Sequence, residues 1–214
     1  NRGHRSGVAG LDDDVDDADV EDLVRAVCHS LRYDRWEGQK HYVEVWVEKQ
    51  ALQSVLQPIG RELHTAIMVN KGYTSASAMY TSSSRLATTD RHPVVLYCGD
   101  FEPSGEDMLR DSSERLREFG AEPQIHKIGL TLEQVKEYAC PPNPAKTTDS
   151  RFEGYADKLR GSDDYFEVCQ AQGLDASETY SWELDSLPVE VLSGLVRTSI
   201  EEYITDPDLI EEIV

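Results

Sequence analysis

The chain has 214 residues and a formal net charge of −20, with 39% hydrophobic and 29% charged residues. This composition is typical of a soluble globular protein with a substantial core, and no stretch approaches the roughly 18 consecutive apolar residues of a membrane-spanning helix. The strong acidity excludes a protein that holds nucleic acid through a general positive field. Any contact with a polyanion therefore requires local basic groups, a metal ion or a partner.

The four cysteines, Cys28, Cys98, Cys140 and Cys169, are widely spaced and include no C-x-x-C pair. This spacing favours neither a zinc site nor a disulfide framework. We therefore expect buried free thiols and a reducing, cytoplasmic location. The sequence begins at Asn1 with no signal-peptide pattern, and we expect it to be a piece of a longer protein.

The first 40 residues are expected to form an acidic leader followed by a helix. Residues 1–20 contain the acidic run from Asp12 to Asp17, which is typical of a solvated segment. From Val20 to Tyr33, apolar residues recur at helical spacing. This part is too short and too polar to show the pattern of a winged-helix domain.

Residues 41–130 alternate between strand patterns and helix patterns. Val43, Val45 and Val47 occupy every second position of the first strand, as a half-buried strand requires. The alternation predicts an α/β fold, Rossmann-like, with a four-stranded parallel sheet and helices on both faces. Strands are expected over 42–47, 65–69, 94–99 and 124–128, and helices over 50–63, 75–86 and from Met108 to Gly120.

Acidic residues follow two of these strands. Asp100 and Glu102 come directly after the apolar run 94–99, and Glu48 comes directly after the first strand. Ligands of open α/β sheets bind at the carboxyl ends of the strands, so we expect these three side chains at one edge. Carboxylates held together favour a hard divalent ion, Mg²⁺ or alternatively Mn²⁺. The alternative is that acids near a helix start merely favour its positive end.

Residues 131–214 are expected to form a mainly helical extension packed on the sheet domain. Thr131 and Gln134 have the spacing of a capping box at a helix start. The Pro-rich stretch 140–151 is expected to have no regular structure, and helices are expected over 163–172 and after Pro188. Three further side chains are expected to be structural: Glu44 within the first strand, and Trp46 and Trp182 in the core.

The residues around these acids resemble the toprim domain of topoisomerases, primases and related nucleases. Val47-Glu48-Lys49 matches the strand-terminal glutamate of that family, and Asp100-Phe101-Glu102-Pro103-Ser104-Gly105 matches its D-x-D motif. The second motif and the loop Asn70–Ser75 look most like the A subunit of topoisomerase VI and the meiotic double-strand-break proteins. Residues 36–52, and 143–151 with Glu183-Leu184-Asp185, are similar to toprim proteins of bacterial and phage genomes. The resemblance is strongest over about 41–130.

The resemblance implies Mg²⁺-dependent cleavage and rejoining of DNA phosphodiesters. Asp100 and Glu102 would hold the ion, and Glu48 would be a ligand or a general acid and base. Two departures from the family pattern are Glu102, where the motif has Asp, and Lys49, where many members have Gly. Topoisomerase relatives attack DNA with a tyrosine on a winged-helix domain, so we assign no nucleophile here and expect that domain to be missing or a partner subunit to be needed.

Basic and hydroxyl side chains are candidates for contact with DNA phosphate. Lys49 follows the catalytic glutamate, and Lys71 and Ser75 follow the second strand. Lys146 and Arg151 flank the Pro-rich stretch, where surface ion pairs that tie down the loop are the alternative.

Three other functions are consistent with the sequence. The first is a toprim nuclease. The second is a non-catalytic, metal-dependent DNA-interaction module that needs a partner, which the charge of −20 favours. The third is a phosphatase or receiver-like domain with an aspartyl phosphate. The sequence around Asp100 lacks the D-x-D-x-[TV] arrangement of such phosphotransfer, and that chemistry does not account for Glu48.

Overall fold

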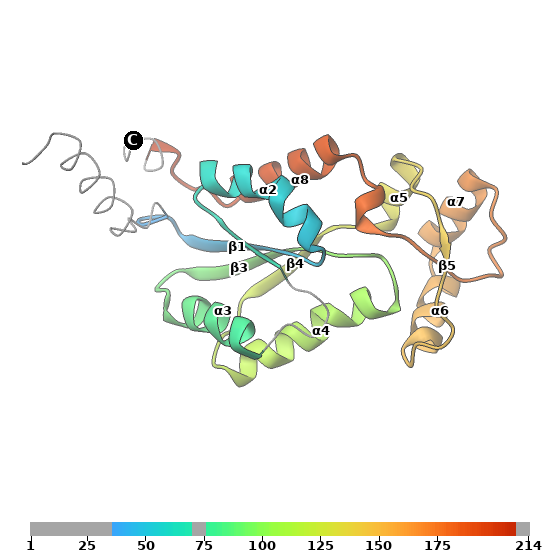
Figure 1. Ribbon diagram of the computed structural model, residues 1–214, viewed down its shortest axis with the longest axis horizontal. Helices are drawn as coiled ribbons and strands as arrows, with labels where there is room; N and C mark the ends of the chain where they lie inside the picture. Colours follow the sequence, from blue (N-terminus) through green and yellow to red (C-terminus); the bar gives the residue numbers. More distant parts are fainter. Residues whose placement is uncertain (1–35, 70–75, 209–214) are drawn as a thin grey trace, which may run out of the picture. The chain divides into compact units, whose positions relative to one another are not determined.

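The computed structural model describes residues 36–69 and 76–208, which belong to one compact unit (Figure 1). The predicted leader, the helix over 20–33 and the loop 70–75 lie outside the described residues. The elements in chain order are β1 (His41–Val47), α2 (Gln50–Glu62), β2 (Ala66–Val69), α3 (Ala76–Thr88), β3 (His92–Cys98), α4 (Pro103–Glu118), β4 (Gln124–Gly129), α5 (Leu132–Glu137), β5 (Asn143–Pro144), α6 (Phe152–Arg160), α7 (Asp163–Gln172), β6 (Tyr180–Ser181), the 3-10 turn η1 (Leu184–Ser186) and α8 (Val189–Glu201).

The central sheet has four parallel strands in the order β2-β1-β3-β4. Val45 of β1 lies opposite Ile67 of β2 and Leu96 of β3, and Leu96 lies opposite His126 of β4. A helix connects each strand to the next, as parallel neighbours require. The predicted fold class is therefore confirmed.

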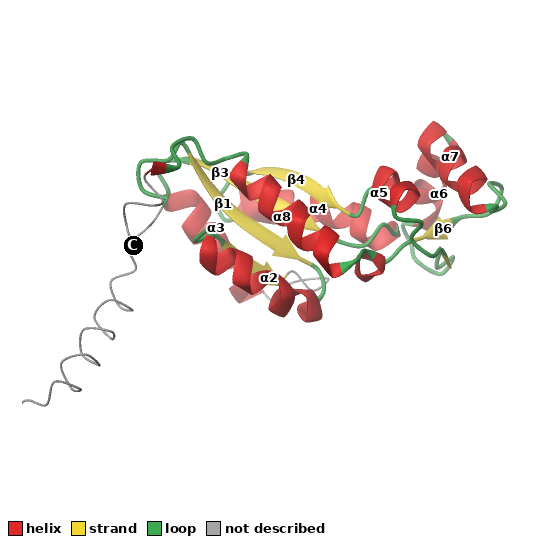
Figure 2. Cartoon of the chain, turned by 90° about the horizontal axis from the view of Figure 1, so that it is seen from above, coloured by secondary structure: helices red, strands yellow, loops and turns green. Residues whose placement is uncertain are grey.

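Both faces of the sheet are covered by helices. Figure 2 shows α2 and α8 running side by side over one face, while α3 and α4 cover the other. Because side chains alternate along a strand, Val45 and Leu96 pack under α2 and α8, whereas Trp46 and Tyr97 pack against α3 and α4. All four are at most 1% exposed. The two-sided burial explains why the two central strands, β1 and β3, are apolar over most of their length.

Glu44 anchors α3 to the sheet. This fully buried carboxylate accepts hydrogen bonds from Tyr42 Oη (3.1 Å), Trp46 Nε1 (3.1 Å), Ser82 Oγ (2.6 Å) and Arg85 Nε (2.7 Å). A buried charge is tolerated when it is paired and fully hydrogen-bonded, and both conditions are met here. The predicted structural role of Glu44 is confirmed.

The part after β4 contains more regular structure than the sequence indicates. The stretch 140–151, predicted to be irregular, includes β5, which pairs antiparallel with β6. That prediction was wrong because a two-residue strand is too short to show periodicity and its partner lies more than 30 positions away. Helix α6 was also missed, whereas α7 spans the predicted 163–172 and the capping box at Thr131 is confirmed. Helices α5 to α7 surround a core that includes Tyr155, Tyr165 and Trp182.

Several predicted core residues are buried as expected. Trp46 and Trp182 have no exposed surface, and Cys98, Cys140 and Cys169 are buried free thiols. Within the described residues, none of the helices has the length and apolar character needed to cross a membrane.

Candidate metal centre

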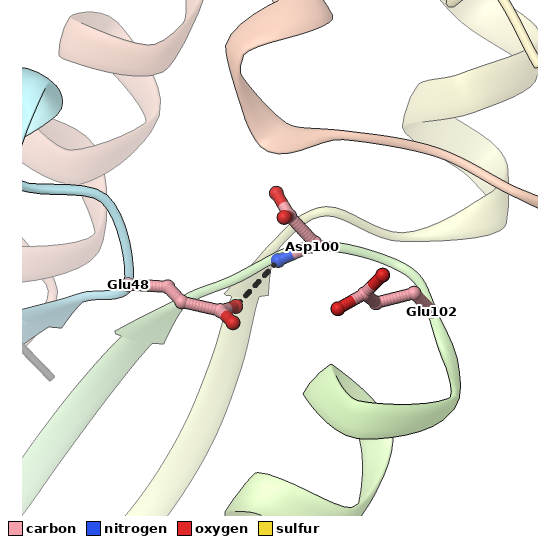
Figure 3. Close-up of side chains that lie close together, drawn as sticks. All are labelled: Glu48, Asp100 and Glu102. Atoms are coloured by element: carbon pink, nitrogen blue, oxygen red, sulfur yellow. Dashed lines mark hydrogen bonds between the residues drawn. The ribbon is translucent and has the colours of Figure 1, made fainter. Parts of the chain in front are cut away.

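Glu48, Asp100 and Glu102 meet at the carboxyl edge of the sheet (Figure 3). One carboxylate oxygen of each residue lies within 4.8 Å of the other two. The cause is the register of the two central strands, in which Val47 at the end of β1 lies opposite Cys98 at the end of β3. The residues that follow these two strand ends therefore emerge side by side, as the sequence predicts.

A tight turn connects β3 to α4 and carries two of the acids. Glu102 is the N-cap of α4, and Pro103 occupies the first helical position. A backbone N–H at that position would have no partner within the helix, so proline is tolerated there. A Cβ at Gly105 would lie 2.4 Å from the carbonyl oxygen of Asp100, so only glycine lets the first turn of the helix approach this closely. The Pro-Ser-Gly sequence thus sets the position of Asp100 and Glu102 on the edge of the sheet.

Glu48 has hydrogen-bond donors but, among the described residues, no ion-pair partner. Its carboxylate accepts hydrogen bonds from the backbone N–H of Asp100 (3.0 Å) and from Tyr97 Oη (3.3 Å). In the described part of the chain, no lysine or arginine forms an ion pair with it. Burial raises the pKa of Glu48, and the nearby charges of Asp100 and Glu102 raise it further. A cation placed between the three acids would favour their ionised forms and so oppose this rise in the pKa of Glu48.

Asp100 occupies a more mixed environment. Burial raises the pKa of its carboxyl group, although the backbone N–H of Leu184 and the charge of Lys49 oppose that rise. The Leu184 N–H donates to Asp100 Oδ1 at 2.7 Å. This hydrogen bond leaves one carboxylate oxygen of Asp100 free of a backbone partner.

The three acids suit Mg²⁺ in donor type and in spacing. Mg²⁺ binds oxygen at about 2.1 Å, so two ligand oxygens on one ion are separated by at most about 4.2 Å. The ligand oxygens lie within 4.8 Å of one another, so rotation of the side chains would bring them to the separations that one ion requires. All three donors are carboxylate oxygens, which are the ligands that hard divalent ions prefer.

A distant segment holds the turn that carries Asp100 and Glu102. The backbones of Phe101 and Trp182 exchange two hydrogen bonds, of 2.8 and 2.9 Å. Tyr155 Oη also donates to the carbonyl of Phe101 at 3.2 Å. Because Phe101 lies between the two acids, this pairing fixes their separation. Burial of Trp182 was predicted, but no local sequence pattern indicates its pairing with Phe101.

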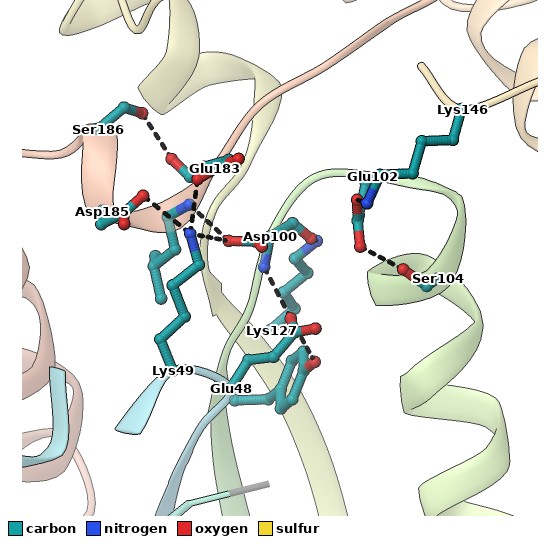
Figure 4. Close-up of polar contacts among 12 residues, drawn as sticks. Glu48, Lys49, Asp100, Glu102, Ser104, Lys127, Lys146, Glu183, Asp185 and Ser186 are labelled. Carbon is teal, nitrogen blue, oxygen red and sulfur yellow. Dashed lines mark hydrogen bonds and ion pairs between the residues drawn. The ribbon is translucent and has the colours of Figure 1, made fainter. Parts of the chain in front are cut away.

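Lys49 lies among three carboxylates on the other side of Asp100 (Figure 4). Its Nζ is 2.9 Å from Glu183 Oε2, 2.9 Å from Asp185 Oδ1 and 3.5 Å from Asp100 Oδ1. Burial alone would lower the pKa of Lys49, but the hydrogen bonds to Asp185 and Glu183 outweigh it and raise the pKa. The lysine is therefore a permanent cation. Glu183 and Asp185 were part of the resemblance, but the sequence assigned them no role.

Lys127 is a second lysine next to the acidic turn. Its Nζ donates to the carbonyl of Asp100 (3.3 Å) and to Glu106 Oε1 (2.5 Å), and it lies 4.9 Å from the ring centroid of Phe101. Burial lowers the pKa of Lys127, and the charge of Glu106 only partly opposes this. Glu106 is also ion-paired with Lys158. Sequence analysis missed Lys127, although a lysine near the end of the predicted fourth strand was an available signal.

The other residues predicted to contact phosphate are not all gathered at the three acids in the described part of the chain. Lys71 and Ser75 lie outside the described residues. Lys146 is 77% exposed and its Nζ is 3.9 Å from Glu102 Oε2. Arg151 makes two hydrogen bonds to the carboxylate of Asp149, of 2.8 and 2.9 Å. Arg151 thus ties down its own loop, which was the alternative to phosphate contact.

Among the described tyrosines, Tyr97 donates its hydroxyl to one of the three acids, Glu48. The side chain is 1% exposed, and burial together with the charge of Glu48 raises the pKa of its hydroxyl group. A buried, protonated phenol that donates to Glu48 is unsuited to attack a phosphodiester. It serves instead to orient Glu48.

Comparison with known proteins adds no relative to this description. The sequence matches none of the protein-family models and has no significant match among the curated proteins. The site itself contains three converging carboxylates, the ammonium group of Lys49 and the partly buried Lys127.

Proposed function

We propose that this protein is a Mg²⁺-dependent enzyme that cleaves and rejoins DNA phosphodiesters, with a toprim-like site. The observation that supports this most is the convergence of Glu48, Asp100 and Glu102 within 4.8 Å at the carboxyl edge of a parallel sheet. The three acids repel one another, and Glu48 has no ion-pair partner among the described residues. A divalent ion bound between them would neutralise this charge. These are also the residues that carry the resemblance to toprim proteins.

The chain's own residues have separate roles in this proposal. Asp100 and Glu102 hold the ion, and when bound, Mg²⁺ supplies positive charge for the nonbridging phosphate oxygens. An oxygen nucleophile forms a bond to phosphorus while the bond to the leaving DNA oxygen breaks. Glu48, fixed by the Asp100 amide and Tyr97, takes the proton of the nucleophile or returns one to the leaving oxygen.

The nucleophile and much of the DNA contact come from outside the described residues in this proposal. Within the described part of the chain, the tyrosine that hydrogen-bonds Glu48 is Tyr97, which is buried and already donates its hydroxyl to that carboxylate. With a net charge of −20, the chain repels DNA at long range. A partner domain or subunit that carries a reactive tyrosine and basic residues would supply both functions. If water takes the place of the tyrosine, the same site is that of a nuclease.

A non-catalytic DNA-interaction module is the second candidate. It is favoured by one observation: the described lysines and arginine predicted to contact phosphate are all within ion-pair distance of carboxylates. In such a module, DNA would be held through the metal ion, which bridges carboxylate and phosphate. Binding of DNA would then rise with Mg²⁺, but no strand would be cut.

A cytoplasmic location fits the proposal. Cys98, Cys140 and Cys169 are free, and burial raises the pKa of Cys98 to about 12. Unpaired thiols are typical of proteins kept in a reducing compartment.

The proposal is tested by titrating Mg²⁺ calorimetrically into the wild type and into the double variant Asp100→Asn/Glu102→Gln. Supercoiled plasmid is incubated with the same samples, with and without EDTA. Asn at position 100 can still accept the Leu184 hydrogen bond, so the turn is expected to keep its position. The matched control is Asp163→Asn/Asp164→Asn, which removes two charges from the first turn of α7.

We expect saturable Mg²⁺ binding in the wild type and the α7 control and none in the Asp100/Glu102 variant. Nicking that follows the same pattern supports the enzyme, and a protein–DNA adduct separates rejoining from hydrolysis. Mg²⁺ binding with Mg²⁺-dependent DNA binding but no nicking favours the interaction module. Identical Mg²⁺ binding by all three proteins would show that these acids are structural and would overturn the proposal.

A further inference from the structure

We propose that Lys49 is a built-in second cation of this site, held by Glu183 and Asp185 as positioning residues, so that the protein uses one bound divalent ion where a two-metal site uses two. The inference rests on the proposed function, because it takes Glu48, Asp100 and Glu102 as the ligands of the first ion. Its basis is the position of the Lys49 ammonium group relative to those acids (Figure 4).

The ammonium group has the surroundings of a bound cation. Three carboxylates contribute oxygens at 2.9, 2.9 and 3.5 Å from Nζ, and they come from two segments more than 80 positions apart. Three negative charges around one positive charge leave an excess that a simple ion pair does not have. A divalent ion in the same place would neutralise more of that charge. Because the ammonium group of Lys49 occupies the place, its presence decides whether a second divalent ion can bind.

Asp100 is shared between the two groups of acids. In two-metal phosphodiester sites the ions lie about 3.5–4 Å apart and act on the attacking and leaving oxygens together. Asp100 belongs to the Glu48 and Glu102 cluster and also lies 3.5 Å from Lys49 Nζ. The ammonium is therefore next to the first ion's ligands, on the side where a second ion would share Asp100.

Local backbone structure places neighbouring residues on opposite sides. Lys49 has extended dihedral angles (φ −96°, ψ 125°) as the N-cap of α2. In extended backbone successive side chains point in opposite directions. Glu48 consequently faces Glu102, whereas Lys49 faces Glu183 and Asp185.

Glu183 and Asp185 are arranged around a buried anchor. Leu184, between them, has no exposed surface, and its N–H donates to Asp100. Ser186 Oγ donates to the carbonyl of Glu183 at 2.6 Å and closes the turn. The two carboxylates stay 56% and 50% exposed, so their role is not to fill the core. They fix the direction of the Lys49 side chain, which is 24% exposed.

An ordinary surface ion pair is the alternative, and the chain offers one for comparison. Lys136 of α5 pairs with Glu167 of α7 at 2.5 Å, and 47% of its side chain is exposed. Lys136 has one carboxylate partner, whereas Lys49 has three, one of them buried in the proposed metal centre. Substitution of Lys136 therefore provides a matched control for substitution of Lys49.

The experiment counts Mn²⁺ ions per chain by calorimetry and by electron paramagnetic resonance of the free ion. The proteins are the full chain as wild type, Lys49→Met, Lys49→Met/Glu183→Gln/Asp185→Asn, and Lys136→Met. Thermal unfolding in EDTA shows whether each variant is folded. We expect one ion in the wild type, two in Lys49→Met, and one in both the triple variant and Lys136→Met.

The wild type separates failure of the inference from failure of the proposed function. No bound Mn²⁺ in the wild type would remove the metal centre and the inference with it. Two ions in the wild type would leave the metal centre in place but show that Lys49 does not fill the second position. One ion in Lys49→Met that is folded would also overturn the inference. Two ions in the triple variant would show that Glu183 and Asp185 do not contribute to the second cation position.

Discussion

Two glutamates four positions apart, one within β1 and one directly after it, have opposite environments. Glu44, within β1, is fully buried and accepts hydrogen bonds from four side chains, one of them the guanidinium of Arg85. Glu48, just after β1, accepts two hydrogen bonds and lies beside two other acids. The strand supports both residues, but only Glu44 has its charge balanced within the described structure.

The difference separates a structural carboxylate from a functional one. A structural carboxylate is stabilised by every neighbour, so its removal leaves buried donors without a partner. A functional carboxylate is destabilised by its neighbours until a ligand binds. Its removal therefore changes the stability of the fold little but weakens ligand binding strongly. Strand position decides between them here, because the middle of a parallel strand is covered by helices and its carboxyl end is not.

Glu48→Gln is the most severe test of this difference. We expect Mg²⁺-dependent plasmid nicking to fall on the order of 10²- to 10⁴-fold, because the proton-transfer group is lost. The fold of the variant is expected to be no less stable than that of the wild type. Nicking is measured beside Glu133→Gln, an exposed glutamate of α5, which is expected to keep full activity. Undiminished nicking by Glu48→Gln would remove the role assigned to Glu48.

Glu44→Ala examines the other member of the pair. We expect the free energy of unfolding in urea to fall by about 3 kcal/mol, since the donors of Trp46, Ser82 and Arg85 lose their acceptor. Glu48→Ala, measured in EDTA, is the matched substitution and is expected to cost far less. Equal losses in the two variants would contradict the distinction between them.

Tyr155→Phe sharpens the comparison by loosening the support of the acidic turn. The hydroxyl donates to the carbonyls of Phe101 (3.2 Å) and Tyr180 (2.8 Å), so we expect a loss of about 1–2 kcal/mol in stability and weaker Mg²⁺ binding. Tyr165→Phe removes a hydroxyl that donates to Glu178 (2.7 Å). It is expected to lower stability similarly and to leave Mg²⁺ affinity unchanged. An equal effect of both variants on Mg²⁺ affinity would show that the turn needs no such support.

The pH dependence of metal-free stability should show the smallest effect. Because the pKa of Glu48 is raised in the folded protein, the folded state binds more protons than the unfolded state between the ordinary carboxyl pKa and the raised one. The protonated form of Glu48 therefore favours the folded state, and this stabilisation is lost as pH rises through that window. Relative to wild type, Glu48→Gln should gain stability as pH rises through that window in EDTA. A constant difference, from urea unfolding at each pH, would refute this.

Much of the fold could be predicted from local sequence. The alternation of Val43, Val45 and Val47 marks a strand, and Thr131 with Gln134 marks a helix start, because each pattern depends on neighbours within a few positions. The meeting of Glu48 and Asp100 also followed, since parallel strands end at one edge of a sheet. Their separation of 52 positions in sequence did not hide it.

The sequence by itself therefore determined which residues form the sheet, which of its strand ends carry acids, and that a divalent ion would suit them. Only the tertiary structure decided how those acids are held and balanced: the pairing of Phe101 with Trp182, and the ion pairs of Lys49 with Glu183 and Asp185. The physical reason is that periodicity and capping act over a few residues, whereas these contacts join segments more than 80 positions apart, brought together by burial of the core around Trp182.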